Sequence, residues 1–236
     1  MLRNLKTYFE FGNRFCGVEH GLLNDQEIIY ATVLKKTKNN VILEHTFKNV
    51  ALENVISKLH KKQAVFLIIN NNNVLTKHIE SSQTALLKLA HHAFPNVDLD
   101  DFFYEVISQE NNNHVVSICR KEYIEGLILN YKTYGVSLID ISLGNAIITS
   151  ISRFLNTTPI ITSNACISMD TDRVTSVEKK NIEDTITYDV NGLQVTNWQL
   201  LSLAGALNIL LDSFYPITNF GALKIIINSP GSIPYS

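Results

Sequence analysis

The chain has 236 residues, of which 45% are hydrophobic and 18% charged, and its formal net charge is −2. This balance is typical of a folded globular protein with one or two domains, and it excludes an intrinsically disordered chain. A nearly neutral chain gives no reason to expect nucleic acid or an anionic membrane surface as a partner. The longest apolar stretch, residues 198–211, is too short and too interrupted to form a membrane helix.

Cysteine and histidine spacing argues against a metal site. Cys16, Cys119 and Cys166 lie far apart in apolar stretches, which indicates reduced thiols in the core of a cytosolic protein. No CxxC pair occurs, and His91 and His92 are adjacent rather than four residues apart, the spacing that places two ligands on one helix face. We therefore expect no bound metal. The asparagine runs at 70–73 and 111–113 are attributed to base composition.

The first third of the chain has the pattern of a β-meander followed by a helix and a buried strand. Apolar and β-branched segments alternate with Asn- and Lys-containing turns, as in successive hairpins. The continuously apolar run at 64–69 indicates a strand buried on both faces, and a strand reached through a helix is usually parallel to its neighbour. The predicted elements are strands at 15–23, 27–37, 41–50, 64–69 and 74–80 and a helix at 52–62.

The middle of the chain reads as an inserted unit of α-β-β-α order, followed by a strand. The three asparagines at 111–113 predict a hairpin loop, and Gly135 is placed to end a helix. In the last third, Asn191 and Gly192 predict another hairpin, and the chain then becomes a strongly apolar helix. The predicted elements are helices at 81–94, 121–134, 144–155 and 198–214 and strands at 102–110, 114–120, 136–143, 159–169 and 174–179, with a hairpin at 186–196 and a last strand around 225–227.

This order of elements resembles the cytoplasmic actin-like domain of type II secretion protein L and type IV pilus assembly protein M. The stretches that carry the resemblance are 15–21, 65–77 and 116–124 leading to Gly135. It implies an α/β chain with the actin-like ATPase, ribonuclease-H-like, two-lobe fold and an inserted small α+β subdomain. The expected units are a first lobe at 1–80, the inserted α-β-β-α subdomain at 81–135, a strand and helix linking the lobes at 136–156, and an incomplete second lobe at 157–236.

In ATP-binding members of this group, the first hairpin holds an acid, a glycine and small hydroxyl residues that cradle phosphate. The resemblance places Gly17, Glu19, Gly21 and Asn24 in that hairpin. Leu22 and Leu23 stand where small hydroxyl residues are expected, and they offer no side-chain donors. These four residues therefore form a vestigial nucleotide hairpin, with ATP and Mg²⁺ as the less favoured alternative and no catalytic residue assigned.

The corresponding hairpin of the second lobe, 163–170, has no glycine. Asp170 and Asp172 are more simply explained as turn caps. Gly144 and Asn145 could bind an anion at a strand-to-helix junction, although a helix cap is the commoner role.

The resemblance implies a non-catalytic scaffold on the cytoplasmic face of the inner membrane. Its expected partners are the secretion or pilus assembly ATPase and inner-membrane assembly proteins, with a homodimer as a further option and no nucleic acid. By the same resemblance, the protein is expected to continue past Ser236 into a membrane anchor. The alternative is an active actin-like ATP-binding protein or a small-molecule kinase. The slight excess of apolar residues predicts a docking face on the first lobe or the inserted unit.

Overall fold

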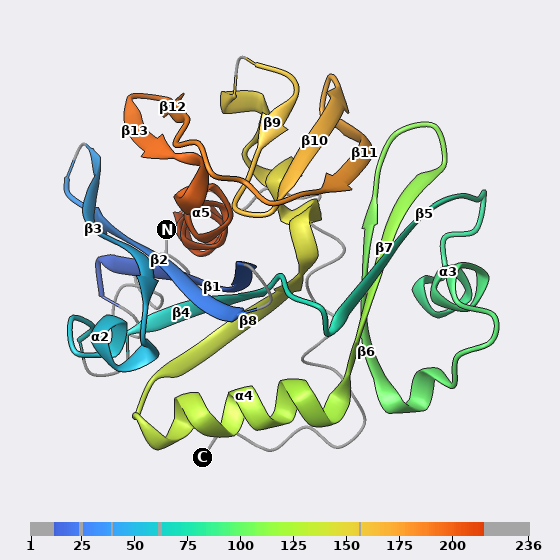
Figure 1. The fold of residues 1–236 in the computed structure, drawn as a ribbon, viewed down its shortest axis with the longest axis horizontal. Helices are drawn as coiled ribbons and strands as arrows, with labels where there is room; N and C mark the ends of the chain where they lie inside the picture. The colour runs from blue at the N-terminus through green and yellow to red at the C-terminus, as the bar shows by residue number, and fades with distance from the viewer. Residues whose placement is uncertain (1–11, 24–25, 39, 61–62, 156, 215–236) are drawn as a thin grey trace.

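The structure is a computed structural model that describes residues 12–23, 26–38, 40–60, 63–155 and 157–214. Its centre is a five-stranded sheet in the order β3-β2-β1-β4-β8 (Figure 1). The meander predicted from the sequence forms the antiparallel half, and β4 and β8 add the parallel half, so the predicted parallel strand is confirmed. The strands are β1 (Arg14–Leu23), β2 (Gln26–Lys36), β3 (Val41–Val50), β4 (Ala64–Ile69) and β8 (Ser137–Leu143).

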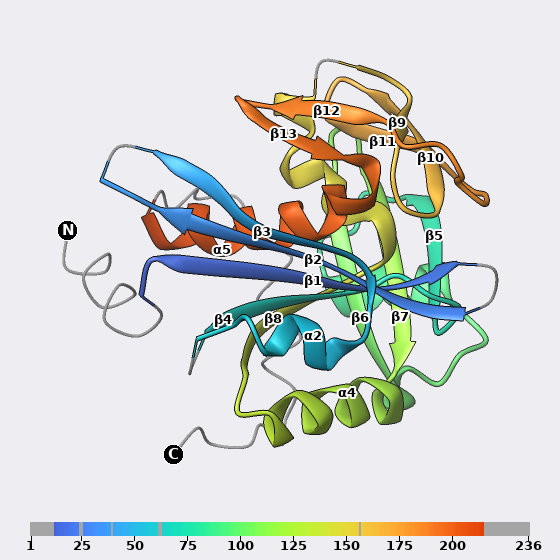
Figure 2. The ribbon, with the colours of Figure 1, turned by 60° about the vertical axis from the view of Figure 1, so that its left-hand side comes forward.

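The long helix α5 (Leu200–Phe214) covers one face of this sheet (Figure 2). It packs so closely that a side chain at either of two glycines would force neighbouring atoms to shift. A Cβ built on Gly17 of β1 would lie 1.8 Å from the backbone oxygen of Ser202, and one on Gly205 would lie 2.7 Å from Ile68 Cδ1. Both distances are below any normal Cβ contact, so glycine at these positions sets the distance between helix and sheet.

The opposite face of the sheet is covered by α4 (Lys121–Thr133) and the short α2 (Leu52–Ile56) (Figure 1). Ile124 and Tyr131 are the buried residues of α4, and they join the core under the sheet. The helix predicted at 121–134 is therefore confirmed, and it packs on the central sheet as well as on Phe103 and Cys119 of the inserted unit to which the sequence assigned it.

The inserted unit is a separate three-stranded sheet with its own core. Its strand order is β5-β7-β6, and α3 covers one face. Strand β5 was expected in the first lobe, yet all seven of its residues pair with β7, so the expected boundary at residue 80 separates β5 from the sheet it joins. The elements are β5 (Val74–Glu80), α3 (Leu86–Ala93), η1 (Leu99–Asp101), β6 (Phe102–Ser108) and β7 (Asn113–Arg120).

The last third of the described chain differs most from the sequence prediction. The α-helix predicted over 144–155 is wrong in type, because two 3-10 helices occupy this segment. Its apolar residues are buried in the main core, where tertiary packing overrides the local helical pattern. The strand predicted over 159–169 is broken into a hairpin by the turn at Ser163 and Asn164. The elements are η2 (Gly144–Ser150), η3 (Ser152–Phe154), β9 (Ile160–Ile161), β10 (Ala165–Asp170), β11 (Arg173–Lys179), β12 (Thr187–Val190), β13 (Leu193–Thr196) and η4 (Asn197–Gln199).

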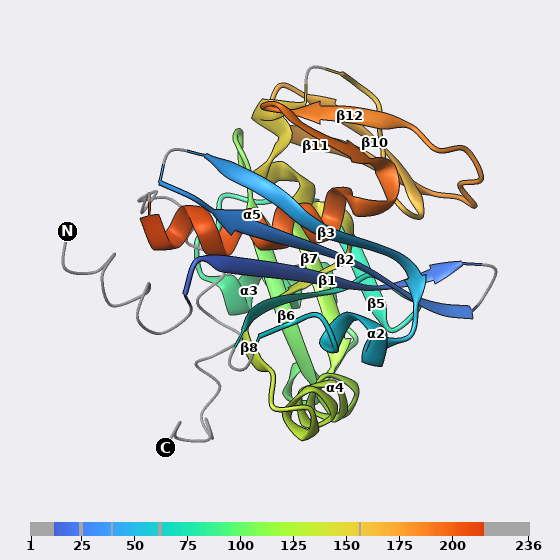
Figure 3. The same ribbon diagram turned by 90° about the vertical axis from the view of Figure 1, so that its left-hand side faces the viewer.

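The two small sheets formed by these strands, β9–β11 and β12–β13, lie beyond α5, on the side away from α4 (Figure 3). In the described part of the expected second lobe, α5 returns to the central sheet instead of covering a large sheet of this lobe. The strand expected around 225–227 lies outside the described residues. None of the helices within the described ranges is long and apolar enough to cross a membrane.

Candidate functional site

The candidate nucleotide hairpin begins in β1, the middle strand of the central sheet, and its acid, Glu19, is completely buried. Along β1, Phe15, Gly17 and Glu19 face the α5 side of the sheet, while Cys16, Val18 and His20 face the α4 side. Glu19 lies in register with Tyr30 on β2 and Ile68 on β4. A carboxyl group in this position is removed from water and must be hydrogen-bonded or neutralised.

The Glu19 carboxyl is hydrogen-bonded through one oxygen and unpartnered at the other. Its Oε1 accepts from Asn70 Nδ2 at 2.9 Å and from Ser163 Oγ at 2.5 Å. Its Oε2 is buried without a hydrogen-bond partner. Burial raises the pKa of Glu19 to about 7, although the hydrogen bonds from Ser163 and Asn70 oppose the shift. The carboxyl is therefore poised between its acid and its anion near neutral pH.

Three asparagines extend this contact into a cluster, which we call the asparagine cluster: Asn70, Asn145 and Asn164. The Asn145 amide donates to the side-chain oxygens of Asn70 and Asn164, both at 3.0 Å. Asn70 donates to the Asn164 oxygen at 3.0 Å, and Asn164 donates back to the Asn70 backbone oxygen at 3.1 Å. Asn70 follows β4 and Asn145 follows β8, so the cluster lies at the carboxyl ends of two parallel strands, where α/β sheets bind ligands.

The turn between β9 and β10 occupies this end of the central sheet. Ser163 and Asn164, from the stretch expected to hold the second phosphate hairpin, contact Glu19 and Asn70 directly. The structure therefore brings the two candidate hairpins together. Their side chains form hydrogen bonds to each other where the two stretches meet. Asp170 and Asp172 are not part of this contact, because Asp170 pairs with Arg173 at 2.7 Å and Asp172 accepts from Ser152.

The glycines of the first hairpin have packing roles in the structure. Gly17 allows α5 to pack closely against β1, as described above. A Cβ on Gly21 would lie 3.2 Å from Glu19 Oε1 and 3.5 Å from the Tyr30 ring, so Gly21 leaves room for the buried acid. Asn24 lies outside the described residues. Asn145 does not cap a helix, since η2 begins after Leu143 with no side-chain cap and the Asn145 amide belongs to the cluster.

Sequence reasoning missed the asparagines. The run at 70–73 was attributed to base composition, yet Asn70 and Asn71 are buried and hydrogen-bonded. A signal was present, because Asn70 directly follows the fully buried strand at 64–69. Ser163 and Asn164 carried no such signal, since their distance from Glu19 in sequence exceeds 140 residues.

A second polar group lies on the α4 side of the sheet and surrounds one exposed carboxylate. Glu27 Oε1 accepts from Tyr123 OH at 2.9 Å and from Asn71 Nδ2 at 3.4 Å, and it lies 3.2 Å from His20 Nδ1. His20 is held in turn by Tyr131 OH at 2.9 Å. The hydrogen bonds lower the pKa of Glu27, and the bond from His20 has the largest effect. This surface carboxylate is therefore an oriented anion near neutral pH.

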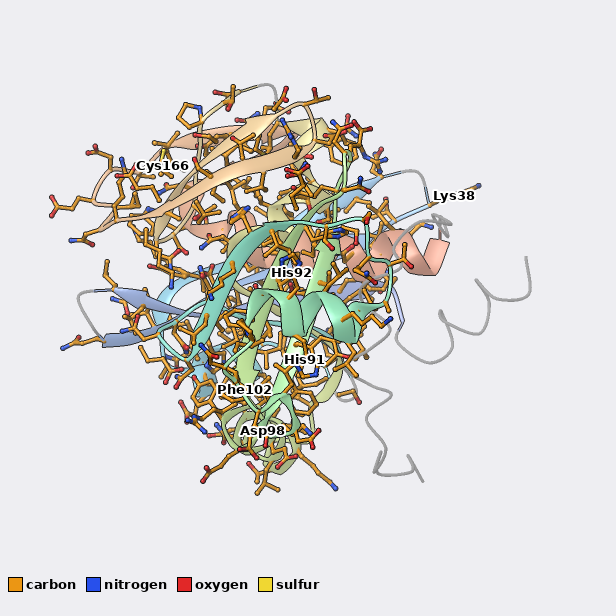
Figure 4. All side chains as sticks on the ribbon, turned by 90° about the vertical axis from the view of Figure 1, so that its right-hand side faces the viewer. Lys38, His91, His92, Asp98, Phe102 and Cys166 are labelled. Atoms are coloured by element: carbon orange, nitrogen blue, oxygen red, sulfur yellow. The ribbon has the colours of Figure 1, made fainter. Side chains whose placement is uncertain are left out.

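Other polar features offer no comparable arrangement. Among the described residues, no three His, Cys, Asp or Glu side chains gather as a metal site requires. His91 and His92 lie on α3 of the inserted unit, well away from Cys166 on β10 (Figure 4). A shallow pocket is lined by Ser152, Leu155, Thr157, Thr158, Ile160, Met169 and Thr171, and none of these belongs to the asparagine cluster.

Neither a family model nor a curated protein sequence matches the chain. Solved structures do match. The PilM-PilN type IV pilus biogenesis complex is 12% identical over 72% of this chain and 62% of that one, with a TM-score of 0.51. The cytoplasmic domain of EpsL, an inner-membrane component of the type II secretion system of Vibrio cholerae, is 12% identical over 70% and 71%, with a TM-score of 0.47.

A Bacteroides thetaiotaomicron protein of unknown function with an actin-like ATPase fold is also 12% identical, over 72% of this chain and 71% of that one, at a TM-score of 0.38. Because these identities are low, the likeness concerns the fold alone, and the conclusion about the fold rests on the PilM-PilN structure. The resemblance stated from the sequence is therefore confirmed for the fold, which this chain shares with the PilM-PilN structure.

Proposed function

We propose that this chain is a non-catalytic cytoplasmic scaffold of a type II secretion or type IV pilus-like machine, which links the assembly ATPase to inner-membrane components. One observation supports the proposal that the scaffold is non-catalytic. The sheet end at which a nucleotide would lie is filled by the Ser163–Asn164 turn, whose side chains bond to Glu19 and Asn70. A phosphate there would have to displace these bonds and approach the buried Glu19 carboxyl.

The proposed partners follow from the likeness to the PilM-PilN complex, whose name describes pilus biogenesis. They also follow from the surface where the central sheet meets the inserted unit. Glu27 presents a carboxylate already fixed by three donors. Strand β5 begins shortly after Asn71, which bonds to Glu27. It is an edge strand that pairs with β7 without a bulge, and its Leu75 is 54% exposed. A strand edge without a bulge can pair with an extended segment, and an oriented anion attracts positive charge. This surface therefore favours an extended, basic segment of a partner protein.

The proposal predicts that Mg-ATP does not bind. Titration of the protein with Mg-ATP in a calorimeter is expected to give no saturable heat at millimolar nucleotide, because the Ser163–Asn164 turn fills the site. Saturable binding together with ATP turnover that Glu19→Ala abolishes would establish the alternative, an actin-like ATPase or small-molecule kinase. The unpartnered Oε2 of Glu19 is the observation that favours this alternative.

The docking surface has its own test. Glu27→Gln keeps an oxygen that can accept from the three donors but removes the negative charge, so we expect about tenfold weaker binding to the partner, roughly 1.4 kcal/mol. Binding would be measured in solution against a purified secretion ATPase and against the cytoplasmic segment of an inner-membrane assembly protein. Glu110→Gln, a change at an exposed acid in the inserted unit, is the matched control. Equal binding by both variants and the unaltered chain would reject this surface.

A further inference from the structure

One carboxyl group joins three parts of the chain. Glu19 lies on β1, Asn70 follows β4, and Ser163 belongs to the turn between β9 and β10. Both donors bond to the same oxygen, Oε1. The side-chain bonds between the central sheet and this turn therefore converge on Glu19 and on the adjacent asparagine cluster.

The remaining oxygen determines which protonation state fits the site. Oε2 is buried without a donor, and the hydroxyl of Tyr30, opposite Glu19 on β2, is also buried and unpartnered. A neutral carboxyl can carry its proton on Oε2 while Oε1 keeps both accepted bonds. An ionised carboxylate instead leaves a charge on a buried oxygen with no donor, which is strongly unfavourable.

The elements packed around Glu19 bring little compensating charge. Tyr30 is the titratable residue opposite it on β2, and burial raises its pKa far above neutral. On β1 itself, His20 faces the α4 side, where it bonds to Tyr131 and Glu27, and Arg14 bonds to Glu44. Cys166 follows the β9–β10 turn, and Asn70, the η2 residue Asn145 and the η4 residue Trp198 are uncharged.

We propose that Glu19 is a proton-operated latch between the central sheet and the small sheet β9–β11, closed when its carboxyl is neutral and opened when the carboxyl ionises. Opening means that Ser163 and Asn164 separate from Glu19 and Asn70 so that water reaches the carboxylate. The raised pKa of Glu19, about 7, places the change near neutral pH. The apolar side chains of β10 and β11, such as Ile167 and Val174, stay in the main core, so opening is local rather than global. This inference does not depend on the proposed partners.

Hydrogen exchange of the backbone amides beside the Ser163–Asn164 turn tests the latch, because Thr162 N donates to the Ala165 oxygen and Lys180 N donates to the Asn164 oxygen. After correction for the intrinsic exchange rate, local opening is expected to increase about 30-fold between pH 5.5 and 8.5, as a shift from 4.5 to about 7 in the pKa of one group requires. Glu19→Gln, which is neutral at every pH, should leave opening independent of pH. The same change at Glu105, the other fully buried carboxyl among the described residues, should leave the pH dependence at Thr162 and Lys180 intact.

A second variant separates the latch from simple packing. Ser163→Ala removes a hydrogen bond that lowers the pKa of Glu19. At low pH this variant should open more often than the unaltered chain. The midpoint of its pH dependence should also move to higher pH, a shift that loss of a structural contact alone would not cause. Opening in the unaltered chain that does not change between pH 5.5 and 8.5 would overturn the proposal. So would a pH dependence that Glu19→Gln leaves in place.

Discussion

Gly17→Ala is expected to reduce the free energy of unfolding by more than about 3 kcal/mol. The added methyl group would lie 1.8 Å from the backbone oxygen of Ser202 and 2.8 Å from the backbone nitrogen of Ala206. Backbone atoms of a helix cannot turn aside as a side chain can. Helix α5 would therefore have to move away from β1, and its buried leucines would lose contact with the sheet. Urea denaturation followed by circular dichroism measures the change.

Gly126→Ala provides the control for this experiment. Gly126 lies in α4 with nothing within 4 Å of an added Cβ, so alanine should raise the free energy of unfolding by about 0.5–1 kcal/mol through helix propensity. The pair also distinguishes two roles for Gly17. If Gly17 served a phosphate and not α5, Gly17→Ala would leave the stability unchanged, and a change below about 1 kcal/mol would contradict the packing described above.

Stability is expected to fall as the pH rises from 4.5 to about 7. Glu19 and Glu105 are both fully buried, and desolvation raises the pKa of each from 4.5 to about 7. Over this range the folded state holds protons that the unfolded state has released, so folding takes up protons and becomes less favourable with rising pH. Each carboxyl should contribute a loss of about 3 kcal/mol, and the loss should level off above pH 7.

The single variants assign this loss to each group. Glu105 joins the inserted unit to the central sheet, because it accepts from Ser142 Oγ at 2.9 Å and from the Leu143 backbone nitrogen at 2.7 Å. Glu105→Gln and Glu19→Gln should each remove the loss due to its own carboxyl from denaturant unfolding between pH 5 and 8. Both variants keep the opposing gain from His78, whose pKa burial lowers. Glu27 does not interfere, since its pKa is lowered on folding and its contribution is lost only below pH 4.5. A flat stability profile in the unaltered chain would contradict the prediction.

Much of the central sheet could be predicted because local pattern and tertiary packing agree there. The run at 64–69 is apolar without interruption, and β4 is buried at all six positions between β1 and β8. The turns of the meander and the hairpin at 111–113 follow from residues with strong local preferences. Asn111 and Asn112 both have positive φ, a conformation that asparagine tolerates better than most residues.

Prediction failed where a long-range contact decided the local structure. The pattern of 144–155 suits an apolar helix, but this segment packs tightly in the core as 3-10 turns. Helix α5 looked like the cover of a second lobe, and it covers the first sheet because Gly17 and Gly205 let it approach. Strand β5 reads as the end of the first lobe, and its seven pairs with β7 place it in the inserted sheet.

The sequence by itself determined the length and near neutrality of the chain, the β-meander with its buried parallel strand, and a first hairpin in which leucines replace small hydroxyl residues. These features depend on residue type and on near neighbours. Only the tertiary structure decided that Glu19 is buried beneath Ser163 and that three asparagines close the sheet end. It also decided that Gly17 serves a helix, because each of these facts depends on residues far apart in sequence whose meeting no local pattern encodes.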